Sequence, residues 1–236
     1  MSISFIIPAK NEENYIGQTI EHILKQPEDL VKEIIVVDNG SADNTVKIAS
    51  SYPKVKVLNE PTRGTNIARQ KGVDAATGDV LAFIDADNWV TESWSETALG
   101  YLSKPGVAGV SGPYIHREQG ILGRLITTWL FFFLSYPFYL LVHYVLKRGS
   151  IVLGGNLAAK REALIQVGGL DTSFAFFGDD ASTGRRLRKA GKVIFTSRLK
   201  VLASARRFQK HGYLPTTFKY FMNFLWVMLF NKPFTK

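Results

Sequence analysis

The chain has 236 residues, no cysteine and a formal net charge of +9. A chain of this length can bury an ordinary hydrophobic core, and the lack of cysteine excludes disulfides and thiolate metal sites, so any bound metal needs oxygen or imidazole ligands. The positive charge favours partners that carry phosphate groups or an anionic lipid surface. We expect no nucleic-acid partner, because no recognition motif accompanies the charge.

Short apolar runs alternate with amphipathic segments along the first part of the chain. The runs read "ISFIIP", "EIIVVD", "VKVL" and "DVLAFID", and apolar residues at helical spacing mark the segments 14–25, 44–52 and 65–76. This alternation predicts βαβ units and a mixed, mainly parallel sheet flanked by helices, which is an α/β fold. Ligands bind at the carboxyl ends of the strands in such a sheet, and Asp38 and Asp85 both end a run.

The second part of the chain is less regular. "GVAGVSGPY" predicts another strand, and "IVLGGNLAAKREAL" predicts a strand, a glycine pair and a helix. "FFGDDASTGRRLRKAGK" predicts a helix that opens on two carboxylates and continues with basic residues. We predict one domain over residues 1–210, followed by an apolar or amphipathic, membrane-associated segment over residues 211–236.

Residues 125–146 contain no Asp, Glu, Lys or Arg and are long enough to span a bilayer. Basic residues flank both ends, so the positive-inside rule assigns no orientation, and Pro137 offers a bend near the middle. We therefore expect a membrane-associated apolar helical insertion over residues 121–148, as a re-entrant hairpin or as two interfacial helices. The alternative is an apolar helical pair that packs in the core or in a homo-oligomer.

Two acidic motifs stand where predicted strands end. Asp38 precedes a tight turn, where a carboxylate can accept hydrogen bonds from a base or a ribose, and the alternative is a plain turn that caps the next helix. Asp85 and Asp87 follow the run "LAFI". Two carboxylates can hold Mg²⁺ or Mn²⁺ when a bound diphosphate supplies further oxygen ligands. The alternative for this pair is a cap for the helix near Ser93.

A third acidic pair, Asp179 and Asp180, opens the predicted basic helix. A carboxylate in a cleft can act as a general base, and the alternative is that both residues cap the helix. We expect Gly155 and Asn156 in "GGN" to shape the acceptor side, since glycine permits close approach of the backbone and an amide can donate and accept hydrogen bonds.

Together these motifs resemble those of the family 2 glycosyltransferases of the inverting GT-A type. The matching segments are "FIIPAKNEE", "IIVVDNGSADNT", "ARQKGVDAATGDVLAFIDAD", "GGNLAAKREALIQVGGLD" and "GDDASTGRRLRKAG", which follow the family's order over residues 3–207. The resemblance implies a Rossmann-like GT-A fold, a nucleotide-diphospho-sugar donor and a divalent cation. The sequence lacks the Q-x-x-R-W motif of processive synthases, which argues against a polymerase.

The resemblance also implies roles for individual residues. Asp38 would contact the base, Asp85 the ribose and the metal, and Asp87 the metal. Asp180 would be the general base, although the family usually has Glu-Asp where this chain has Asp-Asp. Separately, a guanidinium group matches phosphate geometry, so two arginines near residue 206 are expected to clamp the diphosphate. The substrate-binding residues that we predict are Pro8, Lys10, Glu12, Asp38, Asn39, Arg63, Asp85, Ala86, Gly155, Asn156, Asp179, Arg206 and Arg207.

We therefore expect an inverting glycosyltransferase at the cytoplasmic face of a membrane, with Mn²⁺ or Mg²⁺ as cofactor and a lipid-linked or polysaccharide acceptor. One alternative is a non-catalytic membrane-associated protein that binds nucleotide sugars. Another is a nucleotidyltransferase, which would need a glycine-rich basic loop where this chain has "PAKNEEN". A haloacid-dehalogenase-type phosphatase also uses Asp-x-Asp, but Trp89 stands where that class has threonine.

Overall fold

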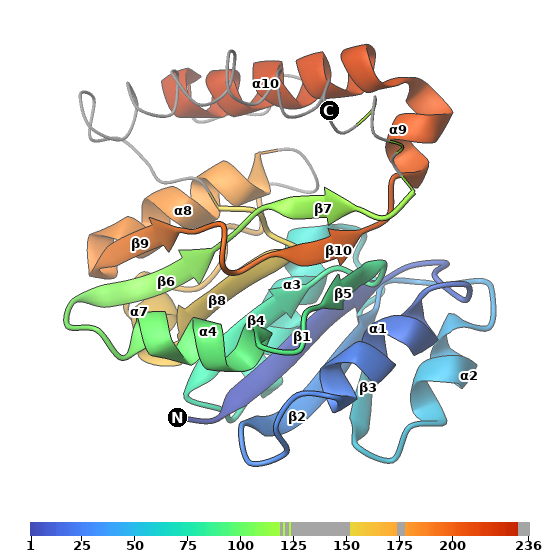
Figure 1. The fold of residues 1–236 in the computed structure, drawn as a ribbon, viewed down its shortest axis with the longest axis horizontal. Helices are drawn as coiled ribbons and strands as arrows, with labels where there is room; N and C mark the ends of the chain where they lie inside the picture. The colour runs from blue at the N-terminus through green and yellow to red at the C-terminus, as the bar shows by residue number, and fades with distance from the viewer. Residues whose placement is uncertain (119, 121–122, 124–151, 174–177, 231–236) are drawn as a thin grey trace.

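A central sheet of seven strands organises the computed structural model, which describes residues 1–118, 120, 123, 152–173 and 178–230 (Figure 1). The strands lie in the order β3-β2-β1-β4-β8-β6-β9. Neighbouring strands are parallel, except that β8 is antiparallel to β4 and β6. The predicted mixed, mainly parallel sheet is confirmed. The bounds are β1 (Ile3–Ala9), β2 (Val31–Asp38), β3 (Val55–Asn59), β4 (Val80–Ile84), β6 (Val107–Ser111), β8 (Asn156–Lys160) and β9 (Lys192–Phe195).

Helices cover both faces of this sheet. One face packs against α1, α2 and α4, and the other packs against α3, α7 and α8. The central strands are therefore buried on both sides, which explains why β1, β4 and β6 and the second half of β2 are continuous apolar runs, whereas the edge strands β3 and β9 are only partly buried. The bounds of these helices are α1 (Ile16–Leu24), α2 (Thr45–Ser50), α3 (Thr65–Ala75), α4 (Trp94–Leu102), α7 (Arg161–Gln166) and α8 (Asp179–Ala190).

The parallel register brings the ends of the first strands together. Ala9 of β1 lies opposite Asp38 of β2, and Asp38 lies opposite Asn59 of β3. On the other side of β1, Ile6 pairs with Phe83, just before β4 ends. The segments that leave β1, β2 and β4 therefore meet at one edge of the sheet, where the acidic motifs were expected.

A small second sheet stands beside that edge. It contains β5 (Asn88–Val90), β10 (Val201–Ala203) and β7 (Tyr114–His116), with β10 in the middle. β10 is antiparallel to β5 and parallel to β7. Because β5 begins directly after Asp87, this sheet fixes the backbone on one side of the second acidic motif.

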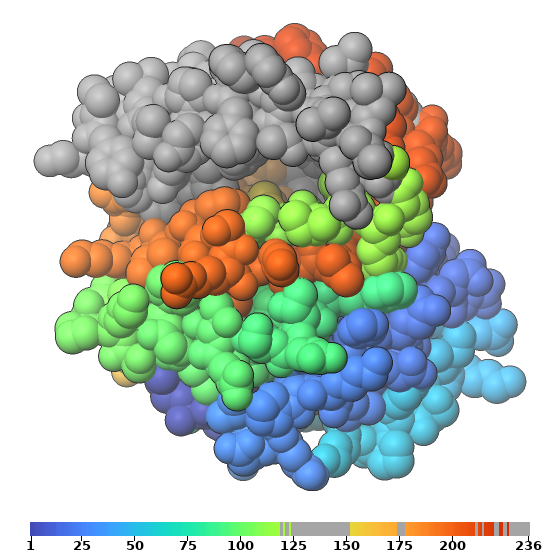
Figure 2. Space-filling model, viewed as in Figure 1, coloured from blue at the N-terminus to red at the C-terminus, as the bar shows by residue number. Residues whose placement is uncertain are grey.

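Two helices follow β10 at the end of the described chain. They are α9 (Arg206–His211) and α10 (Tyr213–Phe230), and they are joined by Gly212 at a φ of +80°. In the space-filling view, the first 50 residues form one end of the molecule and these helices lie at the other (Figure 2). α10 falls within the segment that was predicted to associate with a membrane.

The described residues include no helix that is both long and apolar enough to cross a bilayer. The apolar stretch 125–146 lies outside the described residues. The membrane-associated insertion and the boundary at residue 210 therefore stay predictions.

Two helical glycines allow a test of the packing between α3 and β1. A Cβ atom on Gly72 would lie 2.4 Å from Cγ2 of the buried Ile6, whereas one on Gly100 of α4 would meet no atom within 4 Å. Gly72→Ala should therefore lower the free energy of unfolding by about 1–3 kcal/mol, because overpacking outweighs the gain in helix propensity. Gly100→Ala should raise it by up to about 1 kcal/mol. Urea unfolding measures both, and equal effects of the two substitutions would contradict the close packing of α3 on β1.

Candidate active site

Arg69 on α3 joins two acidic motifs that lie far apart in the sequence. Its Nη2 donates to Asp85 Oδ1 and its Nη1 donates to Asp179 Oδ2, each at 2.8 Å. The Arg69 side chain is only 6% exposed. Burial by itself would lower the pKa of Arg69, but the carboxylates of Asp85 and Asp179 outweigh it and raise that pKa. Arg69 is therefore a buried permanent cation whose two partners are held in place by one planar group.

Arg69 is not among the residues predicted from the sequence, which include Arg63 instead. Arg63 is exposed in the loop before α3. A signal for Arg69 was present, because Asn66, Arg69 and Val73 recur at helical spacing and form one buried face of α3. A charged residue on such a face needs an anionic partner, and candidates were already known from the acidic motifs.

Asp180 lies next to this ion pair at the first turn of α8. Its Oδ1 accepts a hydrogen bond of 2.9 Å from the backbone N–H of Gly154. Burial raises the pKa of Asp180 well above its usual range, and the neighbouring Asp179 raises it further. Burial also raises the pKa of Asp179, although Arg69 opposes this. A carboxyl group with a raised pKa is a stronger proton acceptor when it is ionised.

The glycine pair before β8 is required by the same carboxylates. A Cβ atom on Gly154 would lie 2.3 Å from Asp180 Oδ1, and one on Gly155 would lie 2.1 Å from Asp85 Oδ2. The space left by the absence of side chains on these glycines is therefore occupied by the protein's own carboxylates, and their predicted role on the acceptor side stays a prediction. Gly155 is held in this position by Tyr114, whose hydroxyl accepts from the Gly155 N–H at 3.0 Å.

Asn156 lies behind the site rather than in it. The residue is fully buried. Its Oδ1 accepts from Trp94 Nε1 at 2.9 Å, and its Nδ2 donates to the carbonyl oxygens of Gly112 at 2.9 Å and Leu199 at 2.6 Å. The amide that was expected to face the acceptor is thus used inside the protein, where it anchors the start of β8.

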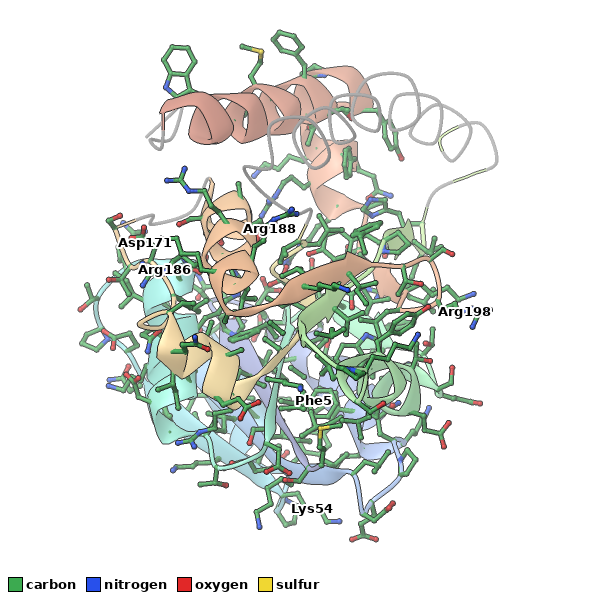
Figure 3. The ribbon with its side chains drawn as sticks, turned by 90° about the vertical axis from the view of Figure 1, so that its left-hand side faces the viewer. Phe5, Lys54, Asp171, Arg186, Arg188 and Arg198 are labelled. Carbon is green, nitrogen blue, oxygen red and sulfur yellow. The ribbon has the colours of Figure 1, made fainter. Side chains whose placement is uncertain are left out.

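α8 is held against the preceding helix by an arginine near its middle. Arg186 Nη2 donates to the carbonyl oxygens of Val167 at 2.8 Å and Gly168 at 3.0 Å. Its Nη1 lies 3.9 Å from Asp171 Oδ2, and the two side chains stand together at the side of α8 (Figure 3). These contacts fix the helix whose first turn carries Asp179 and Asp180.

Asp87 and Glu12 form a second charged cluster with Arg206. Arg206 Nη2 donates to Glu12 Oε1 and lies 3.1 Å from Asp87 Oδ2. The guanidinium group also lies over the ring of Tyr15, 4.7 Å from its centroid. Burial raises the pKa of Asp87 to about 6, and the charge of Asp85 adds to this, although Arg206 opposes it. The cluster therefore carries negative charge that Arg206 only partly offsets.

The composition of this cluster fits a divalent cation that binds together with a substrate. Asp85 and Asp87 offer the oxygen ligands that Mg²⁺ or Mn²⁺ prefers. Glu12 Oε2 is buried, and no hydrogen-bond partner for it lies within the described part of the chain. The described residues contain no group of three or more His, Asp or Glu side chains that could hold a metal ion. A cation here would need further ligands from a substrate. A diphosphate can supply them, as expected from the sequence.

Asp38 and Asn39 build the turn after β2. Oδ2 of Asp38 accepts from the N–H of Gly40, and Oδ1 accepts from that of Ser41, each at 3.2 Å. Asn39 Nδ2 donates to the carbonyl oxygens of residues 60 and 62, at 2.8 and 2.7 Å. Asp38 therefore lies at the predicted edge and also accepts hydrogen bonds within its own turn, whereas the N-cap of the next helix, α2, is Asn44.

The other predicted residues lie around this edge. Pro8 and Lys10 are half-buried at the end of β1, and Ala86 is buried between the two metal-site candidates. Arg207 is exposed on α9, next to Arg206. The structure therefore brings Pro8, Glu12, Asp85, Asp87, Asp180 and Arg206 to one region, whereas Arg63 and Asn156 contribute no side chain to the charged clusters.

Arg117 is a further residue that the sequence analysis missed. Its Nη1 donates to the carbonyl oxygens of Asp87 at 3.1 Å and Leu202 at 2.8 Å. Its guanidinium group lies 3.6 Å from the ring centroid of Trp89, and the opposite face of that ring stacks on His22 at 4.8 Å. This layered contact holds the backbone of Asp87 from behind.

Comparisons with known proteins agree with the sequence motifs. The family model described as glycosyl transferase family 2 matches residues 4–168. A glucosyl-dolichyl phosphate glucuronosyltransferase of Haloferax volcanii is 27% identical over 195 residues, which is 76% of this chain and 59% of that protein. The chain spans less than two thirds of the length of the curated relatives that it matches.

Two solved structures share the fold. One is the mannosyltransferase PcManGT of Pyrobaculum calidifontis in complex with GDP-Man and Mn²⁺. It has a TM-score of 0.65 at 20% identity, and the match covers 97% of this chain and 70% of the PcManGT chain. The glucosyl-3-phosphoglycerate synthase of Mycobacterium tuberculosis, in complex with Mn²⁺, UDP and phosphoglyceric acid, has a TM-score of 0.61 at 22% identity and covers 98% of this chain and 78% of its own. At these identities the likeness shows the fold alone.

The central role of Arg69 can be tested by stability measurements. Arg69→Met should lower the free energy of unfolding by about 3–5 kcal/mol, because it leaves Asp85 and Asp179 without their shared cation. The matched control is Lys71→Met, since Lys71 lies on the same helix, is 41% exposed and stands 3.6 Å from Glu60. It should cost less than about 1 kcal/mol. Urea unfolding measures the free energy of unfolding of both variants. A loss of less than about 1 kcal/mol in Arg69→Met would contradict a buried ion pair that determines the structure.

Proposed function

The chain belongs to glycosyl transferase family 2, and on that premise we propose that it is an inverting glycosyltransferase in which Asp180 is the general base. The observation that carries this proposal is the arrangement around Arg69, where the Asp85 and Asp179 carboxylates share one buried cation and Asp180 lies alongside. Such an arrangement gathers a candidate base and candidate metal ligands at the carboxyl edge of a parallel sheet, which is where ligands bind in this type of fold.

The proposed reaction needs a proton acceptor on the acceptor side. In an inverting transfer, the acceptor hydroxyl attacks the anomeric carbon from the face opposite the leaving diphosphate and loses its proton to a nearby carboxylate. Asp180 suits this role, because the N–H of Gly154 orients its carboxyl group and because burial raises its pKa. Asp179 would orient the base through its own bond to Arg69.

The donor would be a nucleotide-diphospho-sugar bound along the ends of β1, β2 and β4. Asp38 would contact the base, and Asp85 and Asp87 would hold Mn²⁺ or Mg²⁺ against the diphosphate. When bound, the cation offsets the negative charge that develops on the leaving group. The solved complexes of PcManGT and of the phosphoglycerate synthase both contain Mn²⁺ with a nucleotide or nucleotide sugar, which supports this part of the proposal.

The acceptor would be a lipid-linked or polysaccharide hydroxyl that is presented at a membrane. Three observations support this: the uncharged stretch 125–146, the formal net charge of +9, and the exposed Phe218 on α10, whose side chain is 61% exposed. The relative from Haloferax volcanii is described as acting on glucosyl-dolichyl phosphate, which is a lipid-linked sugar. Because nucleotide sugars are made in the cytosol of most cells, the active site would face the cytoplasm.

A screen of ligands tests the donor assignment directly. Thermal unfolding is followed with a panel of UDP-, GDP-, ADP-, CDP- and dTDP-sugars, each with and without Mn²⁺. A true donor should raise the melting temperature in a manner that depends on Mn²⁺, because a ligand that binds the folded state stabilises it by mass action. Hydrolysis or transfer of the best ligand then separates an enzyme from a non-catalytic binding protein. Absence of a shift with every ligand would contradict the donor class.

The role of Asp180 is tested by replacing it with its amide. Asp180→Asn keeps the shape of the side chain and an oxygen that can accept from the Gly154 N–H, but it removes the proton acceptor. Turnover should fall by at least about 10²-fold while donor affinity and melting temperature stay close to those of the parent. The comparison is Asp179→Asn, which should lose less turnover if Asp179 mainly orients its neighbour. Near-parental transfer by Asp180→Asn would place the base elsewhere, and unfolding of this variant would show that Asp180 mainly holds the fold through its bond to Gly154.

Membrane association is tested by flotation of the chain with anionic and neutral liposomes. We expect the full chain to float with anionic vesicles, since each Lys or Arg near the surface contributes about 1 kcal/mol. A variant with Phe132→Asp and Leu140→Asp should float less, because charges would enter the apolar stretch. If the parent remains soluble and monodisperse in the presence of both kinds of vesicle, the alternative of a helical pair in the core or in a homo-oligomer is favoured.

A further inference from the structure

Arg206 contacts Asp87, which is one of the two carboxylates that would hold a metal ion, and the neighbouring Glu12. Its Nη2 atom donates to Glu12 Oε1 and lies 3.1 Å from Asp87 Oδ2. Asp85 stands two residues before Asp87 in the chain, and the Asp85 carboxylate is already paired with Arg69. The positive charge nearest to the Glu12 and Asp87 pair, among the described ion pairs, is therefore the guanidinium group of Arg206.

A metal ion that binds Asp87 would compete with Arg206 for the negative charge of its carboxylate. A cation that coordinates Oδ2 would displace the guanidinium group, and the two positive charges would repel each other at that distance. A metal ion that arrives alone offers Arg206 no new partner. A metal ion that arrives with a diphosphate brings phosphate oxygens, which match the planar fork of a guanidinium group at least as well as a carboxylate does.

The surroundings of Arg206 suit an exchange of partners by the side chain alone. The Arg206 side chain is 40% exposed, so it has room to rotate. The backbone before it is held, because the N–H of the buried Ala205 donates to Glu118 Oε2 at 2.7 Å and the N–H of Arg206 lies 3.3 Å from Ser204 Oγ. Tyr15 supports the guanidinium group from one side at 4.7 Å. No movement of α9 is required.

We propose that Arg206 is the resident counter-ion of Glu12 and Asp87, and that it passes from these carboxylates to the donor diphosphate when metal and donor bind together. Arg206 then makes metal binding depend on the diphosphate: the protein binds the metal weakly by itself and much more tightly with the nucleotide. This inference rests on the proposed function, since it takes a nucleoside diphosphate as the ligand. It makes Arg206 a residue that opposes one ligand and assists the other.

The opposite signs of these two effects provide the test. Binding of Mn²⁺ alone is measured by the loss of the free-ion signal in electron paramagnetic resonance, and binding of UDP and of GDP at saturating Mn²⁺ is measured by calorimetry. In Arg206→Met, we expect Mn²⁺ alone to bind about tenfold more tightly, because a competing positive charge is gone. We expect the nucleotide that the parent binds to bind at least about tenfold more weakly, because a charged hydrogen-bond donor is gone.

Two further variants separate this role from a merely structural one. Arg206→Lys keeps the charge without the planar fork. Its affinity for Mn²⁺ alone should therefore stay as low as that of the parent, and its affinity for the nucleotide should lie between those of Arg206→Met and the parent. Arg198→Met removes the same charge from an exposed residue that projects from the surface near β9 (Figure 3), and it should change neither affinity by more than about twofold. Thermal unfolding of each variant checks the fold, and Arg206→Gln is measured beside Arg206→Met as a second neutral replacement.

The outcomes distinguish this inference from the proposed function. If the parent binds UDP or GDP with Mn²⁺ but the neutral variants bind Mn²⁺ alone no more tightly than the parent, the counter-ion role is wrong and the proposed function stands. The inference is equally overturned if the neutral variants keep full nucleotide affinity. If the parent binds neither nucleotide, the donor is not a UDP- or GDP-sugar, and tighter Mn²⁺ binding by the neutral variants would still establish Arg206 as the counter-ion of the carboxylates.

Discussion

The buried guanidinium group of Arg69 is the constraint on which the rest of the site depends. A permanent cation inside a protein must be paired, because leaving it without an anion costs several kcal/mol. Its two partners come from the end of β4 and the start of α8, and the planar fork fixes the directions in which they bind. Since α3 is packed tightly on β1 through Gly72, the position of the helix determines where the two acidic motifs meet.

The backbone around these carboxylates is adapted to their presence. Gly154 and Gly155 leave the space that Asp180 and Asp85 occupy, and the buried amide of Asn156 anchors the strand that follows them. On the other side of the site, Arg117 bridges the carbonyl oxygens of Asp87 and Leu202. The side chains of Asn156 and Arg117, which have little exposure, thus hold the backbone in place, and the carboxylates lie in the space that this backbone leaves open. The positions of the carboxylates therefore depend on contacts along the whole edge of the sheet.

The sequence predicted the fold and the acidic groups better than it predicted their partners. Strands β1, β2 and β4 were predictable because burial on both faces leaves continuous apolar runs, and the edge followed from the parallel topology. The strands of the second sheet contain three residues each, too few for a pattern, and they form through pairing with distant segments. Asn156 and Arg63 illustrate the remaining limit. Residue type indicates which bonds a side chain can make, but tertiary packing decides whether the protein itself uses them.

The position of β8 in the sheet has a consequence for how the protein is made. β8 lies between β4 and β6 although it follows both in the chain, so neither strand can complete its pairing before residues 156–160 have left the ribosome. Until then β4 is an open edge, which is a template for pairing with other chains. The long-range contacts of this step slow folding, and the nascent chain is most exposed to aggregation in this interval. Because Gly154 and Gly155 arrive with the same strand, the space that Asp180 and Asp85 occupy is completed in the same step, and the growing chain depends on protection of its open sheet until that point.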